Sequence, residues 1–261
     1  MRRHEKPIAD LARKFGVSIS RVSTQAPLPV EATEIDAQII SRVSDFTMTS
    51  RERLWALISA VRYLERLGIE GDFVECGVWR GGSVMAMTHT LIDVGNTDRR
   101  IWLYDTYEGM TAPTDLDVAE DSGMAAQSLL ASTPVADGDN IWCVASLEDV
   151  VTNVLGTGYP RANLEFVRGP VEQTLDVQVP DTIALLRLDT DWYESTHASL
   201  THLYSKLVPG GVCILDDYGH WQGARTAVDR FFEESNVRPL MPIDFSGRIF
   251  IKPYGPTHII E

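Results

Sequence analysis

Apolar runs alternate along most of the chain with stretches whose apolar positions recur at helical intervals. We expect the apolar runs to form strands at residues 72–78, 101–106, 164–168, 183–189, 212–215 and 248–252. The helical intervals predict helices at residues 49–67, 83–94, 147–155, 195–207 and 223–234. Strands that are apolar throughout and alternate with helices are typical of a parallel sheet with both faces covered, so the sequence predicts an α/β domain.

Two helix boundaries carry specific signals. Thr49 and Glu52 have the spacing of a capping box at the start of the first helix, and Gly68 is placed to end it. The Pro-Gly-Gly sequence at 209–211 is expected to close the helix at 195–207 before the next strand.

Two segments lack clear periodicity. Residues 1–34 contain a short candidate helix at 9–22 and then a proline-containing linker, and we expect an N-terminal extension that is partly flexible or contributes to a lid or an oligomer contact. We expect residues 35–261 to form a single domain that begins with helices. Residues 111–140 are acidic and long for a loop, and we hypothesise that they form a lid over an acceptor substrate.

Charge and composition narrow the class of partner. The chain has 23 basic and 37 acidic residues, a formal net charge of -14, which disfavours nucleic acid and anionic membranes. No apolar run reaches the roughly 20 residues that cross a bilayer, and the basic N-terminus lacks the apolar core of a secretory signal. The three cysteines have no CxxC spacing, so we expect a protein of the reducing cytoplasm.

The first expected strand runs into a glycine-rich turn, VECGVWRGGS, at residues 74–83. Gly77, Gly81 and Gly82 allow a tight turn and a close approach of a ligand to the backbone. Glu75 stands at the strand end, where an acid can receive a cationic or hydrogen-bonding ligand. The alternative is a glycine turn that only joins the strand to the helix.

The second expected strand ends in YDTYEGM at residues 104–110. Asp105 follows Glu75 by 30 residues and is placed to accept hydrogen bonds from ribose hydroxyls. The alternative is a solvated acid of an ordinary turn.

Two acidic clusters close two further apolar strands. Asp189 and Asp191 end one strand, and Asp216 and Asp217 end the next. If the strands pair, their carboxylates converge, and like charges at that distance raise one another's pKa unless a cation neutralises them. Oxygen ligands alone favour Mg²⁺, with Ca²⁺ or Mn²⁺ as alternatives. Separate helix caps are the simpler reading, although they do not account for four acids at two strand ends.

The blocks at residues 45–83, 104–110, 185–196 and 215–232 together resemble the macrocin O-methyltransferase family, whose members use S-adenosylmethionine and Mg²⁺ to methylate sugar hydroxyls of natural products. The resemblance runs from about residue 45 to 252 and leaves residues 1–34 outside. It implies a Rossmann-like class I methyltransferase fold with a seven-stranded sheet whose last strand is antiparallel. It also implies a small glycoside or a glycolipid as acceptor and a homo-oligomer.

The resemblance assigns roles to individual residues. It implies that the methionine part of the cofactor is held by Glu75, Gly77, Trp79, Gly81, Gly82 and Ser83. It implies that Asp105 holds the ribose, with Glu108 at the cofactor edge, and that Asp189, Asp216 and Asp217 bind the metal.

A base must then take the proton of the sugar hydroxyl. Asp191 is the first candidate because it follows the metal-binding Asp189 by two residues, and His220 in DDYGH is the second. The lysine base of the related catechol O-methyltransferase has no counterpart in TDWYE. Trp192 and Trp221 flank these clusters and either stack on a ligand ring or belong to the core.

Two other functions fit parts of the pattern. The sequence DTD can be the DxD motif of a metal-dependent glycosyltransferase, with Asp189 and Asp191 holding the metal. That interpretation leaves the glycine turn with Glu75 unexplained. The second is a non-catalytic protein that keeps the fold as an S-adenosylmethionine-binding module.

Overall fold

The computed structural model describes residues 27–135, 140–233 and 240–254. The chain divides into two compact units, residues 1–30 and residues 31–261, and all elements described below belong to the second. The short helix expected at residues 9–22 lies outside the described residues.

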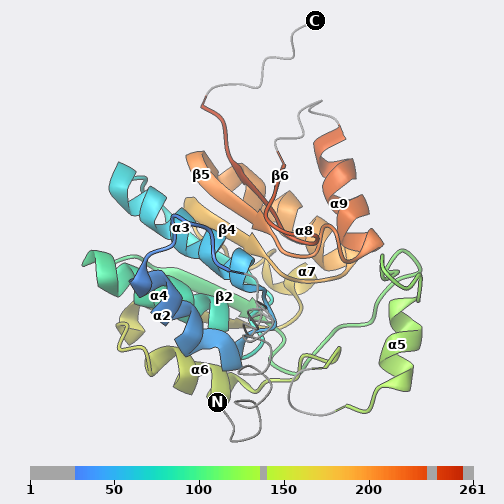
Figure 1. Cartoon of the computed structure of the whole chain (residues 1–261). Helices are drawn as coiled ribbons and strands as arrows, with labels where there is room; N and C mark the ends of the chain where they lie inside the picture. Colours follow the sequence, from blue (N-terminus) through green and yellow to red (C-terminus); the bar gives the residue numbers. More distant parts are fainter. Residues whose placement is uncertain (1–26, 136–139, 234–239, 255–261) are drawn as a thin grey trace, which may run out of the picture. The chain divides into compact units, whose positions relative to one another are not determined.

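A seven-stranded sheet forms the centre of the second unit (Figure 1). Its strands are β1 (Asp72–Cys76), β2 (Ile101–Asp105), β3 (Leu164–Arg168), β4 (Ile183–Leu188), β5 (Leu207–Leu215), β6 (Met241–Pro242) and β7 (Arg248–Ile251). The spatial order is β3-β2-β1-β4-β5-β7-β6, with β1 to β5 parallel and with β7 antiparallel to both β5 and β6. The strand order reverses between β1 and β4, which is where ligands bind in open α/β sheets.

Helices cover the sheet in two groups (Figure 1). One group of mutually contacting helices comprises α2 (Glu34–Val43), α3 (Arg51–Leu67), α4 (Gly82–Val94) and α6 (Leu147–Leu155). The other comprises α7 (Val171–Thr174), α8 (Tyr193–Leu203) and α9 (Gln222–Glu233). The predicted α/β class with a mostly parallel sheet is confirmed. Among the described helices, none is long and apolar enough to cross a membrane.

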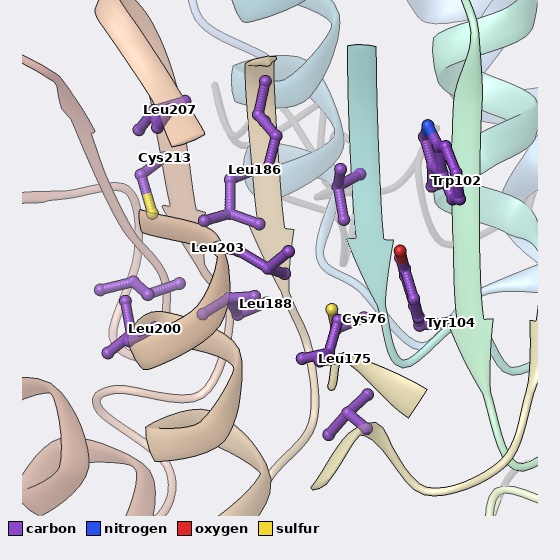
Figure 2. Close-up of a cluster of buried hydrophobic side chains, with 14 of the residues drawn as sticks. Cys76, Trp102, Tyr104, Leu175, Leu186, Leu188, Leu200, Leu203, Leu207 and Cys213 are labelled. Carbon is purple, nitrogen blue, oxygen red and sulfur yellow. The ribbon is translucent and has the colours of Figure 1, made fainter. Parts of the chain in front are cut away.

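The face of the sheet under α8 holds a large apolar cluster (Figure 2). Leu186 and Leu188 of β4 are buried there with Leu200 and Leu203 of α8. Side chains alternate between the two faces of a strand, so Arg187, which lies between these leucines, projects to the opposite face. The apolar cluster thereby fixes on which side of the sheet this charged residue is buried.

The start of α3 differs from the prediction in a way that bears on the site. Ser50, not Thr49, is the N-cap, and its hydroxyl accepts a hydrogen bond from the amide of Arg53 at 3.1 Å. Thr49 instead accepts a hydrogen bond from Arg187 at 2.8 Å. The expected helix end is confirmed, because Gly68 adopts a left-handed conformation with φ 61°.

The strand β5 is longer than predicted. Helix α8 ends at Leu203, a 3₁₀ turn follows at Tyr204–Lys206, and the Pro-Gly-Gly sequence lies inside β5 rather than in the connection. Glycine and proline end a helix, but both residues can be accommodated near the start of a strand.

Residues 111–135 and 140–142 contain more structure than a loop. A short helix, α5 (Ala126–Ser132), packs in a second apolar cluster with Trp192, Trp221 and Ala224. The amide of Glu120 donates to the carbonyl of His220 at 2.8 Å, which joins the segment to the start of α9. The sequence did not predict helix α5, because the segment has no long periodic pattern. Residues distant in the sequence supply most of the apolar cluster in which it packs.

Candidate active site

A cavity of about 580 Å³ opens at the carboxyl ends of β1, β2, β4 and β5. The predicted residues that line it are Gly77, Trp79, Ser83, Asp105, Asp189, Asp191, Asp216, Asp217 and His220. The structure therefore brings the glycine turn, the second-strand acid and both acidic clusters around one space, at the point where the strand order reverses.

The glycine turn lies directly against the end of β4. Gly77 has φ 82°, and a Cβ atom there would overlap the carbonyl oxygen of Asp189. Gly81 has φ 91° and is the N-cap residue of α4, and a Cβ on Gly82 would lie 2.6 Å from the carbonyl oxygen of Phe46. Gly77 and Gly82 are thus needed for close backbone packing on two sides of the turn, and Gly81 for its positive φ.

Replacing Gly77 by alanine is expected to destabilise the protein more than an ordinary glycine substitution. Gly95 is a matched control, because its φ is 80° but no atom lies within 4 Å of a Cβ there. Both alanines carry a left-handed strain of about 1–2 kcal/mol. Gly77→Ala should cost a further ~1–3 kcal/mol from overpacking, measured by urea unfolding. Equal losses in the two variants would contradict the close approach to Asp189.

Asp105 joins the turns that follow β1 and β2. Its carboxylate accepts hydrogen bonds from the amides of Val78 at 2.6 Å, Trp79 at 3.0 Å and Tyr107 at 2.8 Å. Burial raises the pKa of Asp105, although these backbone hydrogen bonds lower it. The side chain lines the cavity, so it both shapes the turn and faces the ligand space.

Four predicted cofactor residues do not line the cavity: Gly81 and Gly82 of the turn, and the two glutamates Glu75 and Glu108. Glu75 is 1% exposed and is paired with Arg187, while its Oε2 atom has no hydrogen-bond partner within the described part of the chain. Burial, opposed by Arg187, raises the pKa of Glu75 to about 8. Glu108 is exposed and pairs with Arg168. Contact of either residue with a cofactor stays a prediction.

Backbone strain is concentrated at the cavity. Non-glycine residues with positive φ in the described ranges are Trp79, Tyr107, Cys143 and Asp191, and all but Tyr107 line the cavity. Such conformations persist where surrounding contacts enforce them and are frequent at functional sites. Trp79 also carries a buried indole N–H, at Nε1, with no partner among the described residues.

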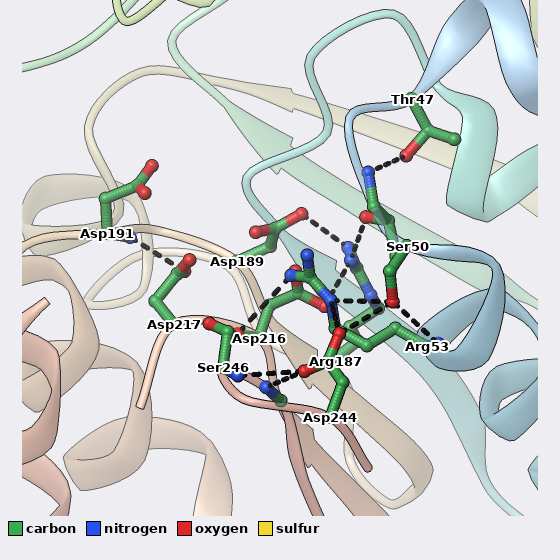
Figure 3. A network of polar contacts seen from close by, with 12 residues as sticks. Thr47, Ser50, Arg53, Arg187, Asp189, Asp191, Asp216, Asp217, Asp244 and Ser246 are labelled. Atoms are coloured by element: carbon green, nitrogen blue, oxygen red, sulfur yellow. Dashed lines mark hydrogen bonds and ion pairs between the residues drawn. The ribbon is translucent and has the colours of Figure 1, made fainter. Parts of the chain in front are cut away.

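Asp189, Asp216 and Asp217 form a compact carboxylate cluster (Figure 3). Each offers one oxygen, and these oxygens lie within 4.8 Å of one another. Burial and then the charges of Asp191, Asp189 and Asp216 raise the pKa of Asp217 well above its usual range. Oxygen-only donors that repel one another in this way fit a hard divalent cation.

Two arginines partly compensate the cluster (Figure 3). Arg187 donates to Asp189 at 2.8 Å and to Asp216 at 2.6 Å, and Arg53 of α3 pairs with Asp216 and, at 3.0 Å, with Asp244. The sequence showed Arg187 only as the one break in an apolar strand, and it gave no signal for Arg53 beyond its place on a helix. In the described ranges, no basic side chain forms an ion pair with Asp217.

The two candidate bases occupy different positions on the cavity wall. The indole N–H of Trp221 donates to Asp191 Oδ1 at 2.7 Å, and the amide of Asp191 donates to Asp217 at 3.2 Å. Burial, followed by the charge of Asp189, raises the pKa of Asp191 to about 7. His220 is half-buried against the rings of Trp221 and Phe245, and burial lowers its pKa.

The wall beyond Asp191 is aromatic. Trp192 and Trp221 meet edge to face with ring centroids 4.8 Å apart, and the indole of Trp192 donates to the carbonyl of Thr111 at 3.1 Å. Both indoles belong to the second apolar cluster and also line the cavity. The two tryptophans therefore belong both to the apolar core and to the wall of the site.

Comparisons with known proteins agree with this geometry. The family model described as Macrocin-O-methyltransferase (TylF) matches residues 14–252, so the likeness begins well before residue 45, where the motifs begin. A demethyldecarbamoylnovobiocin O-methyltransferase of Streptomyces niveus is 33% identical over 202 residues, which is 77% of this chain and 73% of that protein. An 8-demethyl-8-(2,3-dimethoxy-alpha-L-rhamnosyl)-tetracenomycin-C 4'-O-methyltransferase of Streptomyces olivaceus is 34% identical with the same coverage.

A solved structure gives the same result. The O-methyltransferase NovP matches with a TM-score of 0.69 and 31% identity, over 80% of this chain and 82% of that one. The calicheamicin methyltransferase CalS11 matches with a TM-score of 0.58 at 17% identity, over 90% of this chain and 99% of that one, which supports the fold alone.

Proposed function

This chain belongs to the macrocin O-methyltransferase family and is an S-adenosylmethionine-dependent O-methyltransferase, and from that premise we propose that it methylates a sugar hydroxyl of a glycosylated natural product with the help of Mg²⁺. The observation that carries the proposal is that a glycine turn and an acidic cluster share one cavity. The family match does not support the alternative of a glycosyltransferase. A homo-oligomer and a cytoplasmic location stay predictions.

The sugar acceptor is proposed from the relatives and the cavity. The relative from Streptomyces olivaceus has a rhamnosyl derivative in the name of its substrate. In this chain, the indoles of Trp192 and Trp221 and the ring of His220 line the cavity near the acidic cluster. Aromatic faces and edges pack well against the apolar faces of sugar rings.

The chain's residues fit S-adenosylmethionine in three ways. The turn at Gly77 presents backbone to the cavity, the unpartnered Nε1 of Trp79 can donate a hydrogen bond, and Asp105 can accept hydrogen bonds from ribose hydroxyls. Ser83 lines the same part of the cavity, at the start of α4. We propose these four residues, with Gly81 and Gly82 as the backbone support, as the cofactor-binding set.

The residues also fit Mg²⁺, which we propose is held by Asp189, Asp216 and Asp217. The cation, when bound, lowers the pKa of a coordinated sugar hydroxyl and fixes its direction. Asp191, with Oδ1 held by Trp221, then leaves Oδ2 to take the hydroxyl proton, and His220 is the second candidate. S-adenosylmethionine, when bound, would supply the methyl group, whose bond to sulfur would break as its bond to the hydroxyl oxygen formed, with loss of the sulfonium charge.

Calorimetric titration with S-adenosylhomocysteine tests the cofactor part directly. Asp105→Asn should weaken binding about tenfold or more, because the amide cannot accept every hydrogen bond that the carboxylate accepts. Asp72→Asn is a matched control, since Asp72 accepts a hydrogen bond from Trp102 at 2.7 Å at the other end of the strands and does not line the cavity. Absence of binding to the folded wild-type protein would overturn the proposal. Methyl transfer to a panel of glycosides with Mg²⁺ present would then identify the acceptor.

A further inference from the structure

Arg187 lies between the two halves of the proposed site. Its guanidinium donates to Asp189 after β4 and to Asp216 after β5 (Figure 3). It also donates to Glu75 of β1 and, at 2.8 Å, to Thr49 before α3. The side chain of Arg187 is 2% exposed. A single buried cation therefore contacts the strand of the glycine turn and two of the three proposed metal ligands.

Glu75 is the one carboxylate of this group that lies outside the cavity wall. Glu75 and Arg187 are opposite each other in the β1–β4 pairing, so the backbone fixes their contact. Asp189 and Asp216, in contrast, line the cavity, and their carboxylates would interact both with Arg187 and with any bound cation. Glu75 competes with the two aspartates for the same guanidinium.

We propose that Glu75 sets the affinity of the carboxylate cluster for a divalent cation through Arg187, although it does not reach the cation itself. The inference rests on the proposed Mg²⁺ site. When Glu75 is charged, its carboxylate neutralises the guanidinium of Arg187. The carboxylates of Asp189 and Asp216 are then available to bind a cation. Without that charge, Arg187 binds the two aspartates more strongly and the site also loses one negative charge, so both effects weaken cation binding.

Through Arg187, the same arrangement would link the glycine turn to the proposed metal site. Glu75 directly precedes Cys76 and Gly77, and Gly77 packs on the carbonyl of Asp189. A shift of the turn on cofactor binding would move Glu75 relative to Arg187 and change how much charge the arginine places on Asp189. Glu75 is thus a positioning residue for the metal ligands, and its predicted role in cofactor binding would also act through Arg187.

The test is calorimetric titration with MgCl₂ and no cofactor at pH 9, above the pKa of about 8 that burial gives Glu75. Glu75→Gln keeps the shape and removes the charge, and should weaken Mg²⁺ binding about tenfold. Glu65→Gln is the control, because it removes the carboxylate charge of a second glutamate–arginine pair, with Arg99, which is mostly buried and lies away from the cavity. Its Mg²⁺ affinity should equal that of the wild type.

A double variant distinguishes the proposed effect of Glu75 through Arg187, called the relay below, from a general disturbance of the structure. Glu75→Gln with Arg187→Gln removes both charges and restores the net charge of the site, while Asp216 keeps its ion pair with Arg53 and Asp189 is partly exposed to solvent. Its Mg²⁺ affinity should return to within about threefold of the wild type. A further loss in the double variant, or an unchanged affinity in Glu75→Gln, would overturn the relay. If the wild type binds no Mg²⁺ or Mn²⁺, the metal part of the proposed function fails and the relay fails with it.

Discussion

Asp191→Asn should lower kcat for methyl transfer by about 10²–10⁴-fold while the folded protein still binds S-adenosylhomocysteine. An asparagine can keep the hydrogen bond to the indole of Trp221, which is 2.7 Å long in this structure. It cannot take a proton from the acceptor hydroxyl. The loss should therefore appear in kcat, with the KM for S-adenosylmethionine within about threefold of the wild-type value.

His220→Ala decides between the two candidate bases. If Asp191 is the base, His220→Ala should reduce kcat by less than about tenfold, because it removes an aromatic contact to Trp221 and leaves the carboxylate in place. The opposite pattern, with a large loss at His220 and a small one at Asp191, would assign the proton transfer to the histidine. The backbone of Asp191 has φ 62°, a conformation that asparagine also tolerates, so a folding defect is not expected to obscure the comparison.

The parallel strands and the site at their ends could be predicted because their signals are local. Each apolar run produced a strand, and an acid that ends a central parallel strand must lie at the ligand-binding edge. Asp189 and Asp216 therefore could be expected to meet once β4 and β5 were adjacent, and the structure pairs these strands. The glycine turn followed from the same reasoning.

The buried arginines could not be predicted in their roles. Arg187 interrupts an apolar strand, but its partners Glu75 and Asp216 are 112 and 29 residues away. Arg53 follows the helical pattern of α3 and contacts Asp216 across 163 residues. Which distant charges share a pocket depends on strand order and register, which no local pattern encodes.

Helix α5 was missed for a related reason. It has seven residues, too few for a clear period, and its buried residues Ala126 and Leu130 pack on Trp192 and Trp221 of other segments. The proposed lid function of residues 111–140 stays a hypothesis. Asp117, which accepts a hydrogen bond from the amide of Tyr193 at 2.7 Å, ties this segment to the start of α8.

Asp217→Asn should strongly weaken both Mg²⁺ binding and methyl transfer while it stabilises the metal-free protein. Asp189 and Asp216 already have arginine partners, whereas Asp217 forms no ion pair with a described residue. Its carboxylate therefore contributes most of the charge that only a cation can neutralise. We expect Mg²⁺ affinity to fall about 100-fold or more, and EDTA to remove wild-type activity in the same assay.

The stability effect has the opposite sign because the pKa of Asp217 is raised in the folded state, first by burial and then by neighbouring aspartates. The unfolded chain ionises this group near pH 4, so the folded protein is penalised at every pH above that value, and the penalty disappears below it. Asparagine removes the penalty. Urea unfolding in EDTA at pH 7.5 should show a gain of about 1 kcal/mol or more, and no gain at pH 3.5.

Asp244→Asn provides the contrast in stability. Burial raises the pKa of Asp244, but hydrogen bonds from Ser50 and Gly247 and the charge of Arg53 outweigh it and lower the pKa below its usual value. Its charged form therefore stabilises the fold above the unfolded pKa, and this stability is lost as the pH falls through the folded pKa. The asparagine should lower the free energy of unfolding by about 1–3 kcal/mol at pH 7.5.

Added Mg²⁺ should raise the unfolding free energy of the wild type but not of Asp217→Asn, and an equal gain in both would show that the cation binds elsewhere.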